Sequence, residues 1–212
     1  QSPAASGHVG VRRRPDDRRR PGDARDGREA AGDARQNAGD DGVNFRTKMT
    51  LRPVEEQDRD QLRNWRNQDF IRAASLTNHT IDTDEHNHWF DAILTRDDGL
   101  WCVAELSGKP VGHVNAVERQ AGTFQWSFYV GESGCPKGTG AAMLSLFLGA
   151  LFSRPDVDLV TAQSLSVNKA SCHLHQKLGF VRNNDEHEEV WELSLSRKAW
   201  QDHAAAYNAC LD

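Results

Sequence analysis

A uniformly apolar helix that follows a glycine-rich loop constrains this sequence more than any other feature. Residues 141–152 read Ala-Ala-Met-Leu-Ser-Leu-Phe-Leu-Gly-Ala-Leu-Phe, and a helix that is apolar on all sides has to be buried. The loop before it, residues 131–140, follows a strand predicted over 123–130. That strand alternates between an aromatic face and a polar face, with Phe124, Trp126 and Phe128 on one side and Gln125, Ser127 and Tyr129 on the other.

The rest of residues 49–195 alternates between short strand patterns and helix patterns. Thr83 is the predicted N-cap of a helix that carries Asp84 and Glu85 in its first turn. Further helices are predicted over 55–67 and 168–178, and strands over 50–54, 100–106, 111–117, 159–165, about 180–181 and 190–195. A turn over 107–110 joins two of these strands. The order β-α-α-β-β-β-α-β-α-β-β predicts an α/β fold with one mixed sheet flanked by helices.

The composition changes at about residue 48. Residues 1–48 carry 11 basic and 8 acidic side chains and almost no large apolar ones, whereas the net charge of the whole chain is −5. Such a segment cannot offset its ordering entropy by burial, so we expect a disordered extension over 1–48 and a folded domain over 49–212. The chain begins with Gln, and we expect the working protein to begin near Met49. An arginine-rich arm could bind nucleic acid, but its interleaved aspartates weaken that hypothesis.

Cysteine spacing and hydropathy exclude several classes of protein. The four cysteines lie far apart with no CxxC pair, so the sequence predicts neither a zinc site nor a disulfide framework. No apolar run approaches eighteen residues, and the N-terminus lacks the apolar stretch of a secretory signal. We therefore expect a cytoplasmic protein with no membrane partner and no metal.

The loop before the apolar helix has the character of an anion site. It reads Pro136-Lys137-Gly138-Thr139-Gly140-Ala141, which brings unpaired backbone N–H groups and the positive end of a helix dipole to one place. Glycines at 138 and 140 would let a diphosphate approach those amides. No Gly-Lys-Ser/Thr follows and a third glycine is absent, so neither a P-loop nor a dinucleotide fingerprint is indicated.

A second motif makes a family resemblance specific. Residues 168–180 read Asn-Lys-Ala-Ser-Cys-His-Leu-His-Gln-Lys-Leu-Gly-Phe, and with the glycine loop this pattern resembles the GCN5-related N-acetyltransferase (GNAT) superfamily. The resemblance covers residues 49 to about 195. It implies acetyl-CoA as cosubstrate, with its pyrophosphate on residues 136–141 and its pantetheine arm between splayed central strands. The implied contacts of that arm are Phe128, Tyr129, Val130 and Asn168.

Two positions depart from the pattern of that family. Cys135 stands where Arg or Gln is usual, so one phosphate contact would fall to Lys137 or be lost. His175 stands where a tyrosine usually protonates the departing thiolate. Since an imidazolium can also donate a proton, we expect His175 to act as the acid.

The resemblance also implies that the first half of the domain selects the acceptor. Trp65-Arg66-Asn67 with the later Glu85-His86 and Trp89 is similar to the GNAT branch that acetylates UDP-linked 4-amino-4,6-dideoxy-sugars in pseudaminic acid biosynthesis. In that interpretation Arg66 and His86 bind phosphate and Trp89 stacks on a base. The pattern also occurs in relatives that acetylate protein N-termini or ribosomal proteins, so a peptide acceptor stays open.

Direct attack of a neutral amine on the thioester needs no enzyme nucleophile. The base that deprotonates the amine is left open among Glu118, His113 and a water chain, with Glu118 slightly preferred because it ends a central strand. Two hypotheses from other classes also remain: a non-catalytic acyl-CoA-binding protein and a nucleic-acid-binding module. A homodimer is left open.

Overall fold

The computed structural model describes residues 48–185 and 187–209, and the predicted extension over 1–48 lies almost wholly outside this range. The strands are β1 (Met49–Pro53), β2 (Gly99–Leu106), β3 (Lys109–Gln120), β4 (Thr123–Val130), β5 (Leu159–Leu165), β6 (Val181–Arg182) and β7 (Val190–Ser196). The helices are the 3-10 helix η1 (Glu56–Asp58), α2 (Arg59–Arg66), α3 (Asp69–Ala73), α4 (Thr83–Thr95), α5 (Thr139–Phe152), α6 (Lys169–Lys177) and α7 (Arg197–Ala209). This order confirms the predicted mixed α/β fold.

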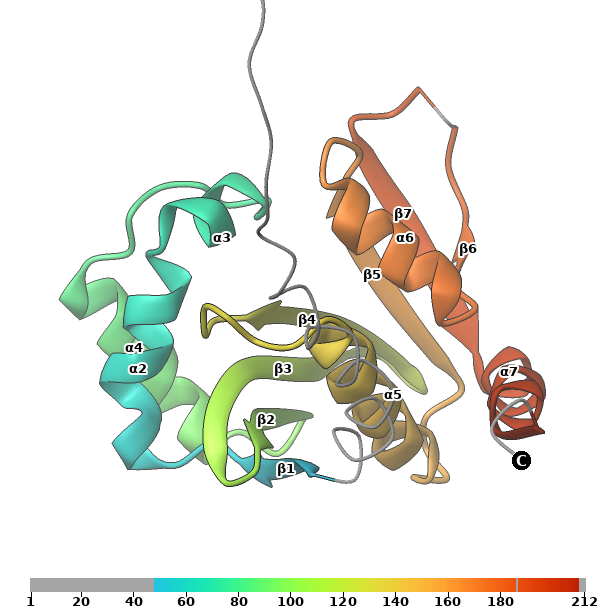
Figure 1. The fold of residues 1–212 in the computed structure, drawn as a ribbon, viewed down its shortest axis with the longest axis horizontal. Helices are drawn as coiled ribbons and strands as arrows, with labels where there is room; N and C mark the ends of the chain where they lie inside the picture. The colour runs from blue at the N-terminus through green and yellow to red at the C-terminus, as the bar shows by residue number, and fades with distance from the viewer. Residues whose placement is uncertain (1–47, 186, 210–212) are drawn as a thin grey trace, which may run out of the picture. The chain divides into compact units, whose positions relative to one another are not determined.

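All seven strands form one sheet in the order β1-β2-β3-β4-β5-β7-β6. Neighbours pair antiparallel except β4 and β5, which are parallel. In Figure 1, β5 and β7 rise steeply beside α6, whereas β3 and β4 run across the view. The sheet therefore changes direction between β4 and β5.

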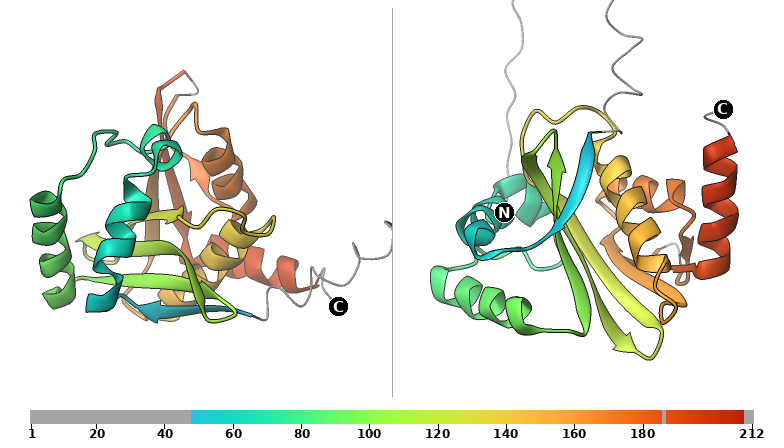
Figure 2. Two further views of the ribbon diagram at one scale, coloured as in Figure 1. Left: turned by 60° about the vertical axis from the view of Figure 1, so that its left-hand side comes forward. Right: turned by 90° about the horizontal axis from the view of Figure 1, so that it is seen from below.

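Two hydrophobic cores cover the two faces of the sheet, because successive side chains of a strand point to opposite sides. On one face, which we call the α5 face, the apolar helix α5 packs on residues such as Val114, Phe124 and Trp126. On the opposite face, Leu62 and Phe90 from α2 and α4 pack against β2 and β3. Figure 2 shows α2 and α4 on the side of the sheet away from α5. The predicted burial of residues 141–152 holds on one side of α5, where six of them are buried, but it was wrong for the other side, where Leu146 is 44% exposed and Gly149 and Ala150 are also exposed.

Three local predictions were wrong. The N-cap of α4 is Asp82, whose side chain accepts a hydrogen bond from the Glu85 amide, and Thr83 is already helical. The β2–β3 turn consists of Ser107 and Gly108, both with positive φ, so residues 109 and 110 belong to β3. The helix predicted over 55–67 is divided into η1 and α2, and the short α3 that follows was not predicted.

Within the described residues, no helix is long and apolar enough to cross a bilayer. Cys102 and Cys172 are buried thiols and Cys135 is half-buried; Cys210 lies outside the described residues.

Candidate active site

The glycine loop presents unpaired amides at the start of α5. Gly138 is the N-cap residue with φ +101°, a conformation that favours glycine. Its carbonyl accepts the Ala142 amide at 3.0 Å, and the Thr139 hydroxyl donates to the Pro136 carbonyl at 2.7 Å. Among residues 48–185 and 187–209, the amides of Gly138, Gly140 and Ala141 donate no hydrogen bond. A Cβ added at Gly138 would meet nothing within 4 Å, so the space beside Gly138 is open to an anion, whereas a Cβ at Gly140 would lie 3.4 Å from Leu174.

Strand β4 is unpaired on one side near this loop. Its parallel pairing with β5 is limited to residues 123–125 opposite 159–161. Residues 126–130 of β4 continue to pair with β3, but residues 162–165 of β5 pair only with β7. Phe128, Tyr129 and Val130 lie in this stretch, which runs directly into the glycine loop. Backbone groups of an unpaired strand can bind an extended ligand by adding to the sheet edge.

His175 lies in the core on the α5 face. Its Nδ1–H donates to the Ser171 carbonyl at 2.8 Å, and its Nε2 accepts the indole N–H of Trp126 at 3.1 Å. The residue is 2% exposed, and burial lowers its pKa. Both ring nitrogens are thus engaged and the imidazole is neutral near pH 7. This geometry does not fit the expected role of proton donor, because tertiary packing turned the side chain toward Trp126.

Glu118 lies at the wrong end of the strands for the expected role of base. It pairs with Phe124, beside the stretch where β4 and β5 are still joined. Its carboxylate accepts the Gly122 amide at 3.1 Å and so closes the β3–β4 turn. The alternative base, His113, is 2% exposed, and burial lowers its pKa to about 4. Neither side chain reaches the unpaired part of β4 as a solvent-accessible base.

Arg66, Trp89 and His86 lie on the opposite face, around the end of β4. Arg66 donates from its Nη2 to the Thr77 carbonyl. Its Nη1 is buried without an acceptor in the described part of the chain, and burial lowers its pKa. The Trp89 ring is 39% exposed and lies 6.1 Å from the ring of His113, which in turn lies 5.5 Å from that of Tyr129.

His86 is enclosed rather than presented to solvent. Its ring lies 5.4 Å from that of Trp89 and 5.7 Å from that of Phe90. Both ring nitrogens are buried without a hydrogen-bond partner in the described residues, and burial lowers the pKa of the imidazole. The expected phosphate contact does not fit this placement, which instead supports the ring of Trp89.

Asn168 is the N-cap of α6 and uses both side-chain groups within the protein. Its Oδ1 accepts the Ser171 amide at 3.1 Å, and its Nδ2 donates to the Ala74 carbonyl, just after α3, at 3.2 Å. The side chain of Asn168 therefore links α6, which follows β5, to the end of α3, on the side of β4.

The predicted anion loop is exposed at Pro136, Lys137 and Gly138.

Sequence reasoning missed the polar contacts on the opposite face of β4. The Ser127 hydroxyl donates to Asn115 Oδ1 at 2.7 Å, and Gln125 Nε2 donates to Gln163 Oε1 on β5 at 3.4 Å. The alternation along residues 123–130 had placed Gln125 and Ser127 on one polar face, which was the available signal. Their partners come from other strands and depend on register.

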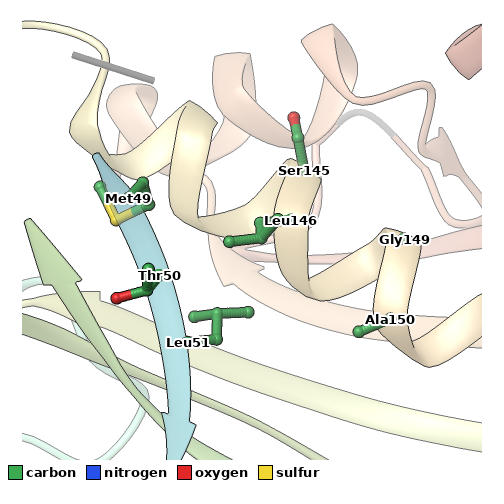
Figure 3. Close-up of a pocket in the computed structure, with 7 residues that line it drawn as sticks. All are labelled: Met49, Thr50, Leu51, Ser145, Leu146, Gly149 and Ala150. Carbon is green, nitrogen blue, oxygen red and sulfur yellow. The ribbon is translucent and has the colours of Figure 1, made fainter. Parts of the chain in front are cut away.

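An apolar groove of about 550 Å³ lies apart from these residues, between β1 and α5 (Figure 3). Its lining holds no titratable side chain and includes Met49, Leu51, Leu146 and Ala150. In the described residues, no group of three or more His, Cys, Asp or Glu side chains is arranged to bind a metal ion. The groove therefore adds no reactive group to the stretch where β4 and β5 do not pair.

Solved structures, two acetyltransferases among them, share this architecture. Spermidine N-acetyltransferase from Vibrio cholerae, solved with CoA and spermine, is 17% identical with a TM-score of 0.65 and covers 73% of this chain and 99% of its own. The aminoglycoside acetyltransferase AAC(6')-Ib, solved with coenzyme A, is 19% identical with a TM-score of 0.62 over 74% and 99% of the two chains. A domain from Methanocaldococcus jannaschii is 22% identical with a TM-score of 0.61 over 70% and 98%.

A comparison with curated protein sequences finds no match. The family described as acetyltransferase (GNAT) domain matches residues 48–181, which is well over half of the chain. This match agrees with the geometry described above, in which residues 126–130 of β4 do not pair with β5 and the amides at the start of α5 are free. The chain belongs to the GNAT family as an acetyl-CoA-dependent N-acetyltransferase.

Proposed function

We propose that this enzyme acetylates the 4-amino group of a UDP-linked 4-amino-4,6-dideoxy-sugar, as in pseudaminic acid biosynthesis. The observation that carries the proposal is Arg66, a half-buried guanidinium whose Nη1 has no acceptor within the described chain. A buried N–H without a partner costs free energy, and a phosphate oxygen would satisfy it. Arg66 as a whole is half-buried, so a phosphate at this site would bind to a guanidinium that is partly accessible.

The cosubstrate fits the loop and the unpaired strand. In our proposal, the amides of Gly138, Gly140 and Ala141 bind the pyrophosphate, with Pro136 and Thr139 shaping the loop and Lys137 adding a positive charge. The backbone of Phe128, Tyr129 and Val130 pairs with the pantetheine arm. Acetyl-CoA supplies the activated thioester when bound, and an amide of β4 stabilises the negative charge that develops on its carbonyl oxygen. Asn168 contributes by holding α6 and α3 in place.

Two further features favour a nucleotide sugar over a polycation. The exposed ring of Trp89 offers a stacking surface for uracil. The exposed side chains that flank the unpaired strands on the opposite face, Ser127 and Gln163, are neutral. Spermine and aminoglycosides are the ligands named for the similar structures, and a polycation would be recognised by carboxylates at those positions.

The test measures acetyl transfer to a UDP-4-amino-4,6-dideoxy-sugar, spermidine, an aminoglycoside and a peptide in parallel. Arg66→Ala should lower kcat/KM for the UDP-sugar by roughly 10- to 100-fold, the effect of one charge-assisted hydrogen bond, and leave the Kd for acetyl-CoA unchanged. Arg63→Ala is the matched control, since Arg63 lies on the same helix and donates to Thr83 instead. The proposal fails if the UDP-sugar is not acetylated, or if both variants behave alike. Transfer to the peptide that tolerates Arg66→Ala would favour the protein-acetylating alternative.

A further inference from the structure

Where β4 and β5 separate, the described residues leave one face of the sheet exposed and fill the other. On the α5 face, Trp126, Phe180 and His175 fill the space beside β4, with the Trp126 and Phe180 rings stacked at 4.9 Å. The His175 ring lies 5.0 Å from that of Phe180, and all three side chains are buried. On the opposite face, Ser127 of β4 and Gln163 of β5 are exposed. A nucleophile that attacks a thioester held between the strands has to come from the opposite face.

Ser127 is the first exposed side chain that such a nucleophile meets along β4. The last residue of β4 paired with β5 is Gln125, so Ser127 is two residues into the unpaired stretch and on the same face. The next side chain on that face, Tyr129, packs against the core formed with α2 and α4, and its hydroxyl contacts the Leu62 carbonyl at 3.4 Å. Ser127 therefore stands alone as an accessible hydroxyl on the unpaired part of β4.

Neighbouring side chains hold the Ser127 hydroxyl in a defined direction. Asn115 is its register partner on β3, and the hydroxyl donates to Asn115 Oδ1 at 2.7 Å. Gln125, anchored by Arg119 Nε at 2.9 Å, bridges to Gln163 across the point where the strands separate. A hydroxyl that donates its proton to an amide oxygen keeps its lone pairs for an incoming N–H group.

We propose that Ser127 orients the acceptor amine by accepting a hydrogen bond from one of its N–H groups, and that Asn115 is a positioning residue that acts through Ser127. The amine nitrogen then forms a bond to the acetyl carbon and the carbon–sulfur bond breaks. The nitrogen loses one proton to solvent, and the coenzyme A thiolate takes one from solvent. The same contact applies whichever amine is the acceptor, so this proposal does not depend on the UDP-sugar.

The structural test is a crystal structure with acetyl-CoA bound, which needs no acceptor. The acetyl carbon should lie next to Ser127 Oγ and face the side away from α5. An acetyl group that faces Trp126 and His175, or that lies at the Val130 end of the strand away from Ser127, would overturn the proposal.

The kinetic test uses whichever of the four acceptors named above is acetylated fastest. Ser127→Ala should lower kcat roughly fivefold to tenfold, the net effect of one neutral hydrogen bond, while KM for acetyl-CoA stays within twofold. Ser127→Thr should recover most of the rate. Ser194→Ala is the matched control, because Ser194 lies on the same face of β7 and donates to Asn183.

A double-mutant cycle separates positioning from a general structural effect. Asn115→Ala should lower kcat, and the double variant Ser127→Ala with Asn115→Ala should be no slower than Ser127→Ala alone. Additive losses, or a Ser127→Ala enzyme with unchanged kcat, would contradict the proposal. Should the UDP-sugar fail as acceptor while another amine shows these effects, the proposed substrate is wrong and the role of Ser127 stands.

Discussion

At the scale of single residues, His175 connects two elements that the chain separates by almost fifty residues. Its Nε2 accepts the indole N–H of Trp126 and so joins α6, which follows β5, to β4, while its Nδ1–H donates to the Ser171 carbonyl within α6. These two hydrogen bonds also fix the tautomer, since Nδ1 carries the proton and Nε2 accepts. The imidazole therefore links α6 to β4 on the α5 face, next to the point where β4 and β5 stop pairing.

Replacing His175 tests this link. His175→Ala should lower the free energy of unfolding by about 2–4 kcal/mol, because the indole N–H of Trp126 loses its acceptor and a cavity forms. His175→Gln keeps an acceptor and should cost less. We expect kcat of the folded His175→Gln enzyme to stay within a few-fold of that of the unmodified protein. Chemical denaturation measures the stability of each variant, and steady-state kinetics measures its kcat. A stable His175→Gln enzyme that loses 100-fold in kcat would restore the role of proton donor.

At the scale of elements, the opening between β4 and β5 is held by α3 and α6. The parallel pairing ends after three residue pairs, and Asn168 then links the start of α6 to the end of α3. The unpredicted helix α3 matters for this reason, since it supplies the Ala74 carbonyl. Its five residues carry too short a pattern to be distinguished from a loop in the sequence.

Two substitutions at Asn168 separate its capping role from its link to α3. Asn168→Ala removes both hydrogen bonds and should lower the free energy of unfolding by about 0.5–2 kcal/mol. Asn168→Asp keeps the cap and places a negative charge at a helix N-terminus, which is favourable, but it loses the N–H donor to Ala74. We expect the free energy of unfolding of Asn168→Asp to stay close to that of the unmodified protein, and we expect amide hydrogen exchange in α3 to be faster. Equal exchange in α3 for all three proteins would show that the link is dispensable.

At the scale of the whole molecule, three buried histidines in the two cores make the free energy of unfolding depend on pH. Burial lowers the pKa of His86, His113 and His175, and the pKa of His113 falls to about 4. The unfolded chain takes up protons as the pH falls below about 6.5, whereas the folded protein resists protonation at these sites. The contribution of each neutral histidine to the free energy of unfolding is therefore complete above pH 6.5 and is lost as the pH falls below that value.

This linkage predicts acid sensitivity in a window where carboxylates contribute little. Between pH 7 and pH 5, the free energy of unfolding should fall, with His113 alone contributing up to about 1.4 kcal/mol for each pH unit below 6.5. Urea denaturation at several pH values measures the slope. His113→Gln should make the slope shallower, and His88→Gln, at an exposed position of α4, is the matched control. A slope that His113→Gln leaves unchanged would contradict the prediction.

Much of the fold was predictable because periodicity is a local property. The alternation along 123–130 and the uniformly apolar 141–152 determine a strand and a buried helix wherever they lie in the fold. The predicted spans of β4 and β5 were therefore correct to the residue. Errors fell at turns and caps, as with Ser107 and Asp82, where one residue decides the boundary.

The sequence by itself determined the order of the seven strands, the apolar helix α5 and a glycine loop with amides suited to an anion, since each depends on residues close together in the chain. Only the tertiary structure decided where His175, Glu118 and His86 point, and it placed them in the core, at a turn and under Trp89. The pairing of Ser127 with Asn115 was likewise decided by register between strands. The physical reason is that the partner of a side chain is set by strand register and by packing against elements that are distant in the sequence, and neither is encoded locally.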